Sequence, residues 1–125
     1  MTGRRQVFTL IELLVVMAII GTLLTLAVPR YFRSVQRSRE AVLMQDLASL
    51  RESIDKFYVD TGHYPPSLAT LVEKRYLRSI PVDPISRAAD RWVVVSSDDP
   101  DDNGVKDVHS GAEGAGENGV PYAAW

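Results

Sequence analysis

Apolar and polar residues divide the chain into three zones. Residues 8–28, FTLIELLVVMAIIGTLLTLAV, are almost wholly apolar, and Glu12 is their only charge. These roughly 21 residues form a helix about 32 Å long, which matches the roughly 30 Å hydrocarbon core of a bilayer. In the second zone, from residue 30 to residue 57, apolar residues recur at intervals of three and four. The third zone is the rest of the chain, which contains short β-branched and acidic stretches. The first zone predicts a membrane-spanning helix.

The second zone predicts an amphipathic helix with one apolar face. No Gly or Pro interrupts residues 30–61, and Asp60-Thr61-Gly62 supplies a stop. Pro29 lies between the two zones, where it either ends the first helix at the membrane surface or kinks or locally melts a continuous one. The periodicity favours one helix of about 50 residues, or roughly 75 Å. Its apolar stripe comprises Phe32, Val35, Leu43, Leu47, Leu50, Ile54 and Phe57.

The third zone predicts a small α+β domain that covers this stripe. Residues 67–77 are typical of a short helix, and residues 91–96 and 105–109 are typical of strands that pair as an antiparallel hairpin. The Gly-rich residues 111–119 predict a loop that does not pack. The two aromatic residues of the C-terminal PYAAW are expected to dock on the sheet or the helix.

Composition narrows the possible functions. The 125 residues include no cysteine, which excludes disulfides and thiol chemistry, and the net charge is −2. The two histidines are far apart, and neither a zinc-protease motif nor a phosphate-binding loop occurs, so we expect no enzyme. Arginines cluster at residues 30–39, and acidic residues cluster at 98–118. We expect the arginines to contact lipid headgroups or neighbouring subunits rather than nucleic acid.

Glu12 is the most informative single residue of the apolar zone. A carboxylate at the centre of a bilayer costs roughly 2.5–3.5 kcal/mol on insertion scales, so it indicates a functional site. Thr9 and Glu12 also fit the S/T-x-x-E capping box, in which each side chain accepts a backbone N–H at the start of a helix. The two roles can coexist, and the residue chemistry alone leaves both open.

The N-terminus resembles that of type IV pilins and type II secretion pseudopilins. Arg4 and Arg5 form a short basic leader, Phe8 begins FTLIE, and Pro29 ends the apolar run. In that family a cut precedes a Phe, Glu is fifth after the cut, and Pro is often twenty-second, as Glu12 and Pro29 are here. The resemblance implies a leader at 1–7, a transmembrane and assembly helix at 8–29, and a periplasmic globular domain at 30–125.

The resemblance also implies how the chain is processed and assembled. A prepilin peptidase would cut between Val7 and Phe8 and methylate the new amine of Phe8. The helix would then leave the membrane for a fibre, in which Glu12 pairs with the N-terminal amine of a neighbour and sets the register, while Pro29 lets the helix adapt. The family almost always has Gly where this chain has Val7. Cleavage of this chain is therefore expected to be slow, to need a permissive peptidase, or to fail.

The implied function is that of a structural subunit of a type II secretion pseudopilus, most like the major pseudopilin. Such a subunit polymerises into a periplasmic fibre that drives protein export. It would be a single-pass inner-membrane protein with a cytoplasmic N-terminus. Its partners would be further copies, minor pseudopilins, the prepilin peptidase and the inner-membrane assembly platform. The alternatives are a pilus or competence subunit, and an uncleaved anchor that carries a small calcium- or ligand-binding module.

The acidic turn that joins the two predicted strands, residues 99–107, predicts a calcium site. Its spacing follows the D-x-[DN]-x-[DN]-G pattern of calcium loops, but no bidentate Glu ends it and no helix pair flanks it. An ordinary solvated turn of Asp, Pro, Asn and Gly is the alternative. A resemblance to the major pseudopilins, which carry calcium in a C-terminal loop, favours calcium. The candidate ligands are Asp99, Asp101, Asn103 and Asp107, with Asp102 and Ser110 as reserves.

Overall fold

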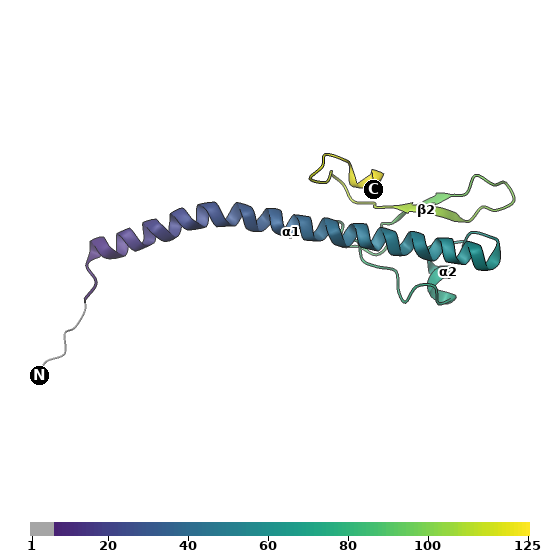
Figure 1. The fold of residues 1–125 in the computed structure, drawn as a ribbon, viewed down its shortest axis with the longest axis horizontal. Helices are drawn as coiled ribbons and strands as arrows, with labels where there is room; N and C mark the ends of the chain where they lie inside the picture. Colours follow the sequence, from purple (N-terminus) through teal and green to yellow (C-terminus); the bar gives the residue numbers. More distant parts are fainter. Residues whose placement is uncertain (1–6) are drawn as a thin grey trace, which may run out of the picture. The chain divides into compact units, whose positions relative to one another are not determined.

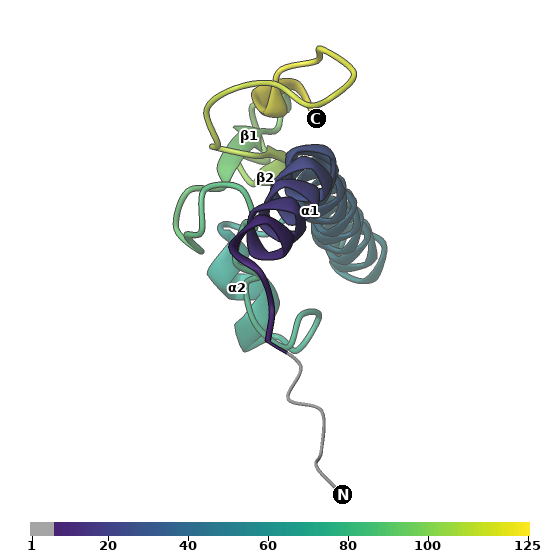
Figure 2. The same ribbon diagram turned by 90° about the vertical axis from the view of Figure 1, so that its left-hand side faces the viewer.

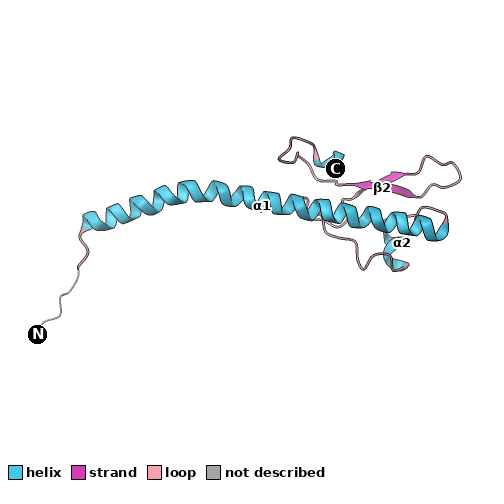
Figure 3. Ribbon diagram, viewed as in Figure 1, coloured by secondary structure: helices cyan, strands magenta, loops and turns pink. Residues whose placement is uncertain are grey.

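A computed structural model describes residues 7–125, so of the predicted leader all but Val7 lies outside the described residues. The elements in chain order are a long helix, a short helix, two strands and a 3-10 helix (Figure 1). They are α1 (Leu10–Thr61), α2 (Leu68–Glu73), β1 (Val93–Ser96), β2 (Val105–His109) and η1 (Tyr122–Ala124). Helices dominate, and the strands form a single pair (Figure 3). The predicted α+β, pilin-like fold is confirmed.

The helix α1 contributes to two compact units, which divide between Gln36 and Arg37. In the first unit, α1 runs through Pro29 without interruption. The alternative in which Pro29 ends the helix is therefore wrong, and the helix is not melted there. The C-terminal stop is confirmed, because Gly62 takes a φ of 77° and its N–H bonds to the carbonyl of Tyr58 at 2.8 Å.

In the second unit, α1 provides the spine of the hydrophobic core. The hairpin and α2 lie on different sides of this part of the helix (Figures 1 and 2). Phe32, in the first unit, is predicted to begin the buried stripe, but its side chain is 65% exposed. The buried apolar residues of the stripe are Leu43, Leu47, Leu50, Ile54 and Phe57.

The short helix is shorter than predicted. Ser67 caps it, accepting the N–H of Thr70, and α2 ends at Glu73 rather than at residue 77. The chain turns at Arg75, whose φ is 65°, and the N–H groups of the next two residues both bond to the carbonyl of Leu71. This turn brings the following residues back against the core, where a longer helix would carry them away.

The hairpin matches its prediction closely. The strands β1 and β2 pair in antiparallel fashion, with Val94 opposite Val108. Regular pairing begins at Val93, later than the predicted start at residue 91. The reason is that Trp92 turns into the core and its indole N–H donates to the carbonyl of Pro81 at 2.8 Å.

The Gly-rich loop at 111–119 is a loop as predicted, but the prediction that it does not pack is wrong. Ala112 is buried in the core. Gly111 lies against the carbonyl of Arg91 so closely that a Cβ would collide with backbone, and Gly116 lies against the ring of Trp125. Small residues here allow close packing, which composition alone cannot distinguish from flexibility. The docking of the two C-terminal aromatic residues is confirmed: Tyr122 is buried, and Trp125 packs edge-on against it.

Candidate functional site

Glu12 lies in the first turn of α1, and its contacts confirm the capping box. The N–H of Thr9 donates to Glu12 Oε2 at 3.2 Å, and the N–H of Glu12 donates to Thr9 Oγ1 at 3.2 Å. Two N–H groups that no helical carbonyl can accept are thereby satisfied. The carboxylate also lies at the positive end of the helix dipole. The capping contacts hold Glu12 in a defined position at the end of an apolar surface.

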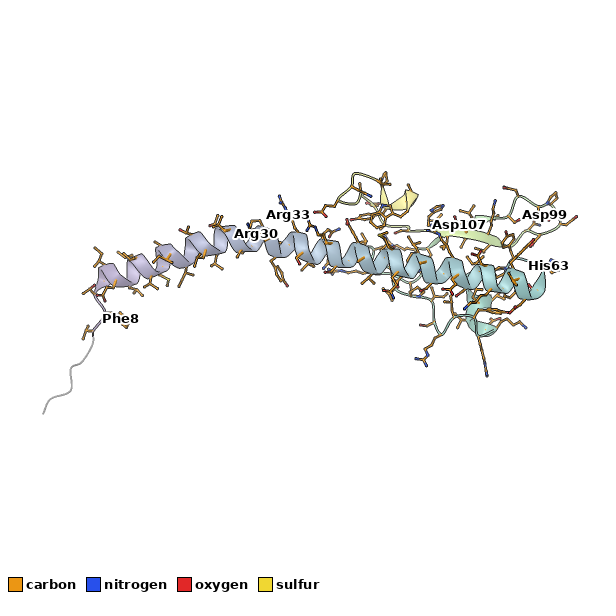
Figure 4. The ribbon with its side chains drawn as sticks, viewed as in Figure 1. Phe8, Arg30, Arg33, His63, Asp99 and Asp107 are labelled. Atoms are coloured by element: carbon orange, nitrogen blue, oxygen red, sulfur yellow. The ribbon has the colours of Figure 1, made fainter. Side chains whose placement is uncertain are left out.

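The predicted cleavage site precedes this turn. Residues 7–9 have no regular secondary structure, and Phe8 is 78% exposed (Figure 4). The bond between Val7 and Phe8 therefore lies in accessible, non-helical chain directly before α1. A cut there would place the new amine at Phe8, close in sequence to the Glu12 carboxylate.

The first part of α1 presents apolar side chains all round. It is long and apolar enough to cross a membrane, and none of its most apolar stretch is buried within the chain. Its two threonines do not disturb this surface. The hydroxyls of Thr22 and Thr25 donate to the carbonyls four residues earlier, each at 2.8 Å, so both are satisfied inside the helix. This surface requires either lipid or other apolar chains around it.

The acidic hairpin brings together only some of the predicted calcium ligands. Asp99 Oδ1 accepts the N–H of Asp101 at 3.0 Å, and both residues are exposed in the turn that also holds Asn103. Asp102, a reserve ligand, instead ties the turn to the chain before α2, because its carboxylate accepts the N–H of Tyr64 at 2.9 Å. The turn is thus shaped by hydrogen bonds from its own carboxylates.

Asp107 lies apart from the turn, on β2 (Figure 4). Its Oδ1 accepts Arg51 Nε at 2.9 Å and the N–H of Val108 at 2.8 Å. Burial alone would raise the pKa of Asp107, but these hydrogen bonds and the charge of Arg51 lower it overall. Within residues 7–125, no three or more His, Asp or Glu side chains are grouped so as to hold a metal ion. Calcium binding stays a prediction.

The other reserve ligand, Ser110, is wholly buried and bonds to Asp83. The hydroxyl of Ser110 donates to Asp83 Oδ2 at 2.5 Å, and Asp83 Oδ1 accepts the N–H of Ile85 at 2.8 Å. This carboxylate organises the loop at residues 81–84, Pro-Val-Asp-Pro, and joins it to the end of β2. A hydroxyl committed to Asp83 in the core does not serve the exposed turn.

The sequence reasoning did not identify the contacts that hold the C-terminal segment on α1. Glu40 is buried, and its Oε1 accepts the hydroxyl of Tyr122 at 2.8 Å and the N–H of Glu117 at 3.1 Å. Arg37 Nε pairs with the Glu117 carboxylate at 2.9 Å. Glu40 precedes Leu43 by one helical turn, so a carboxylate placed on the apolar stripe was the available signal.

Comparisons with known proteins identify relatives of this chain. It is 29% identical over 99 residues to the type II secretion system core protein G of Escherichia coli (strain K12), an alignment covering 66% of this chain and 68% of that protein. It is 30% identical over 101 residues to the protein of the same name from Aeromonas hydrophila, covering 67% of this chain and 71% of that one. It is also 34% identical over 80 residues to the fimbrial protein EcpC of Eikenella corrodens, covering 60% and 52%.

No family model matches the chain, and no solved structure matches it significantly. The alignment spans about two thirds of the length of each of these two core G proteins. The alignments and the N-terminal motif point to the same group of proteins. The chain belongs to the family of the type II secretion system core protein G, among the pseudopilins and pilins.

Proposed function

We propose that this chain is a structural subunit of a type II secretion pseudopilus, which polymerises through α1 into a periplasmic fibre that drives protein export. The observation that carries this proposal is Glu12, a lone carboxylate held at the start of an exposed apolar helix beside the accessible bond between Val7 and Phe8. The family to which the chain belongs supports it.

The proposed assembly step joins two opposite charges. Removal of residues 1–7 by the prepilin peptidase leaves a cationic amine at Phe8, and methylation preserves that charge. In a fibre core, a carboxylate without a partner is costly, and an amine from a neighbouring copy offsets the cost only at the correct axial position. Glu12 therefore sets the register more than it adds net stability, as single polar residues do in coiled coils.

The apolar surface of α1 explains how the helix can move from the membrane into a fibre. Lipid covers α1 before assembly, and the same surface meets other copies afterwards. Pro29, which lies within the helix, removes one backbone N–H and gives α1 a place to adapt during extraction. In this proposal the inner-membrane assembly platform performs the extraction, and minor pseudopilins and further copies of this chain receive the subunit.

The test is an assembly assay in cells that carry the peptidase and the secretion machinery. The wild-type chain should begin at a methylated Phe8, as shown by its mass, and should cross-link into fibres. Glu12→Val should insert into the membrane but fail to assemble, and Glu52→Gln, which alters an exposed carboxylate paired with Lys56, should assemble normally. A wild-type chain that keeps its first seven residues and stays monomeric in such cells overturns the proposal.

A pilus subunit is the second candidate, favoured by the similarity to a fimbrial protein. Both candidates share the processing and the Glu12 contact, so those steps do not separate them. A complementation assay distinguishes the two candidates. A pseudopilin restores export of secreted proteins in a strain that lacks its own core protein G, whereas a pilus subunit does not.

A further inference from the structure

Arg30 and Arg33 are exposed at the C-terminal end of the apolar part of α1 (Figure 4). Residues three apart on a helix share a face, with Cβ atoms about 5–6 Å from each other, so both guanidinium groups can reach one anion. Within residues 7–125, the ion pairs of the structure involve neither arginine. By contrast, Arg37, on the same helix, is paired with Glu117 at 2.9 Å.

The neighbouring sequence offers these two arginines no carboxylate. Between Glu12 and Glu40 the chain contains no Asp or Glu. Glu40 itself is buried and committed to the hydroxyl of Tyr122. The anion that Arg30 and Arg33 can bind must therefore come from outside this stretch of the helix.

Tyr31 and Phe32 indicate where that anion lies. Their rings are 66% and 65% exposed and pack edge to face, with centroids 5.8 Å apart. Tyr is enriched at the interface between hydrocarbon and headgroups, where its amphipathic ring lies at the level of the headgroups. The helix from Leu10 to Pro29 rises about 30 Å, the thickness of the hydrocarbon core. In a membrane whose hydrocarbon core begins at Leu10, Arg30 would lie at the level of the lipid phosphates on the other side.

We propose that Arg30 and Arg33, flanked by Tyr31 and Phe32, bind the phosphate of an anionic phospholipid headgroup on the periplasmic side of the membrane. This inference rests on the membrane insertion in the proposed function. A guanidinium presents its donors in a plane that matches two phosphate oxygens. Basic residues are normally favoured on the cytoplasmic side of a span. A bound phosphate gives these arginines a specific role on the opposite side, which a subunit must give up when it leaves for the fibre.

The experiment uses the full chain in nanodiscs that contain equal amounts of phosphatidylcholine and phosphatidylglycerol. Native mass spectrometry after release counts the lipids of each kind that stay bound. The wild-type chain should retain phosphatidylglycerol several-fold in preference to phosphatidylcholine. The double variant Arg30→Gln/Arg33→Gln should lose this preference, and Arg30→Lys/Arg33→Lys should keep part of it, because lysine supplies charge without the planar donor pair. The matched control is Arg75→Gln/Arg78→Gln, which removes the same charge from exposed residues of the second unit.

Several outcomes overturn the proposal. One is equal retention by the wild type and the Arg30/Arg33 glutamine variant, and another is an equal loss in the control. Displacement of the lipid by millimolar inorganic phosphate would indicate a free-phosphate site. If the glutamine variant keeps the lipid preference but loses cross-links between copies, the anion is a carboxylate of a neighbouring copy. Glu12→Val separates this proposal from the proposed function, because it should abolish assembly and leave the lipid preference unchanged.

Discussion

Arg51 on α1 and Asp107 on β2 are joined by an ion pair of 2.9 Å between Nε and Oδ1. The other arm of the same guanidinium, Nη2, donates to the carbonyl of Val108 at 2.9 Å and to a main-chain oxygen of Trp125 at 2.8 Å. One side chain thus connects α1, β2 and the C-terminal segment. It is one of several contacts that hold the two-stranded hairpin on α1, together with the burial of Val105 and Val108 in the core.

Replacing Arg51 with Ala should therefore destabilise the second unit. The variant loses three hydrogen bonds, two of them to main-chain oxygens, and we expect a cost of about 1–2 kcal/mol because both side chains of the pair are partly exposed. Urea unfolding of the full chain in detergent, followed by tryptophan fluorescence, measures it. Lys56→Ala, which removes an exposed helical pair with Glu52, should cost less than about 0.5 kcal/mol. Equal costs for the two variants would contradict this role of Arg51.

The ion pair between Arg51 and Asp107 should make the stability of the fold depend on pH in the acidic range. The pKa of Asp107 is lowered in the folded chain, because hydrogen bonds and the charge of Arg51 outweigh its burial. Its stabilising contribution is therefore complete above the unfolded pKa of about 3.9 and is lost as the pH falls through the lower, folded value. Asp107→Asn should reduce the loss of stability below about pH 4 and leave the pH dependence above pH 5 unchanged. Unfolding curves from pH 2 to 7 test this, and identical slopes below pH 4 would count against it.

Tyr122 provides a test of the contact with Glu40. Tyr122→Phe keeps the ring in the core but removes the hydroxyl that donates to the buried carboxylate at 2.8 Å. Losing this hydrogen bond to a buried carboxylate, which keeps the N–H of Glu117, should cost about 1–3 kcal/mol. Tyr58→Phe removes a hydroxyl from an exposed ring that stacks on Tyr64, and it should change the unfolding free energy by less than about 0.5 kcal/mol. Should Tyr122→Phe prove as mild as Tyr58→Phe, Glu40 is satisfied by other groups.

The sequence predicted those parts of the fold that local patterns specify. The apolar run, the spacing of Leu43 to Phe57 and the β-branched residues of both strands each carry a period or a propensity, so the helix and the hairpin could be located. The capping contact of Glu12 was also predictable, because its partner Thr9 is three residues away. Local patterns do not, however, report which surface another segment covers.

The contacts that could not be predicted join residues distant in the chain. Glu40 meets Tyr122, Arg51 meets Asp107, and both pairs depend on how the C-terminal segment and the hairpin return to α1. The spacing of the acidic residues predicted Asp107 as a calcium ligand of the turn. In the structure Asp107 lies on β2 and pairs with Arg51. The spacing of residues along the chain shows which side chains could be ligands. It does not show that one of them, such as Asp107, already pairs with an arginine.

Calcium binding at the acidic turn can be tested directly. Asp99 and Asp101 supply exposed carboxylates in one turn, and Asp98, beside them, pairs only at the surface with Lys106 at 3.3 Å. Oxygen ligands of this kind suit calcium. Millimolar calcium should raise the melting temperature of the full chain in detergent, and Asp99→Asn/Asp101→Asn should abolish the rise. Magnesium at equal concentration is the control for charge screening, and an unchanged melting temperature in calcium would remove the site.

Processing at Val7 offers a test that does not depend on assembly. The bond between Val7 and Phe8 lies in exposed, non-helical chain, so the expected obstacle to the proposed cleavage is the bulky, β-branched side chain of Val7. Val7→Gly should therefore speed cleavage by purified prepilin peptidase severalfold without changing the cut position, as followed by the mass of the product. Val59→Gly, a change of the same side chain at another exposed position, should leave the rate unaltered. Cleavage of the wild type at the rate of Val7→Gly would show that this peptidase has no preference for a small residue. Failure of Val7→Gly to be cut at all would remove the predicted site.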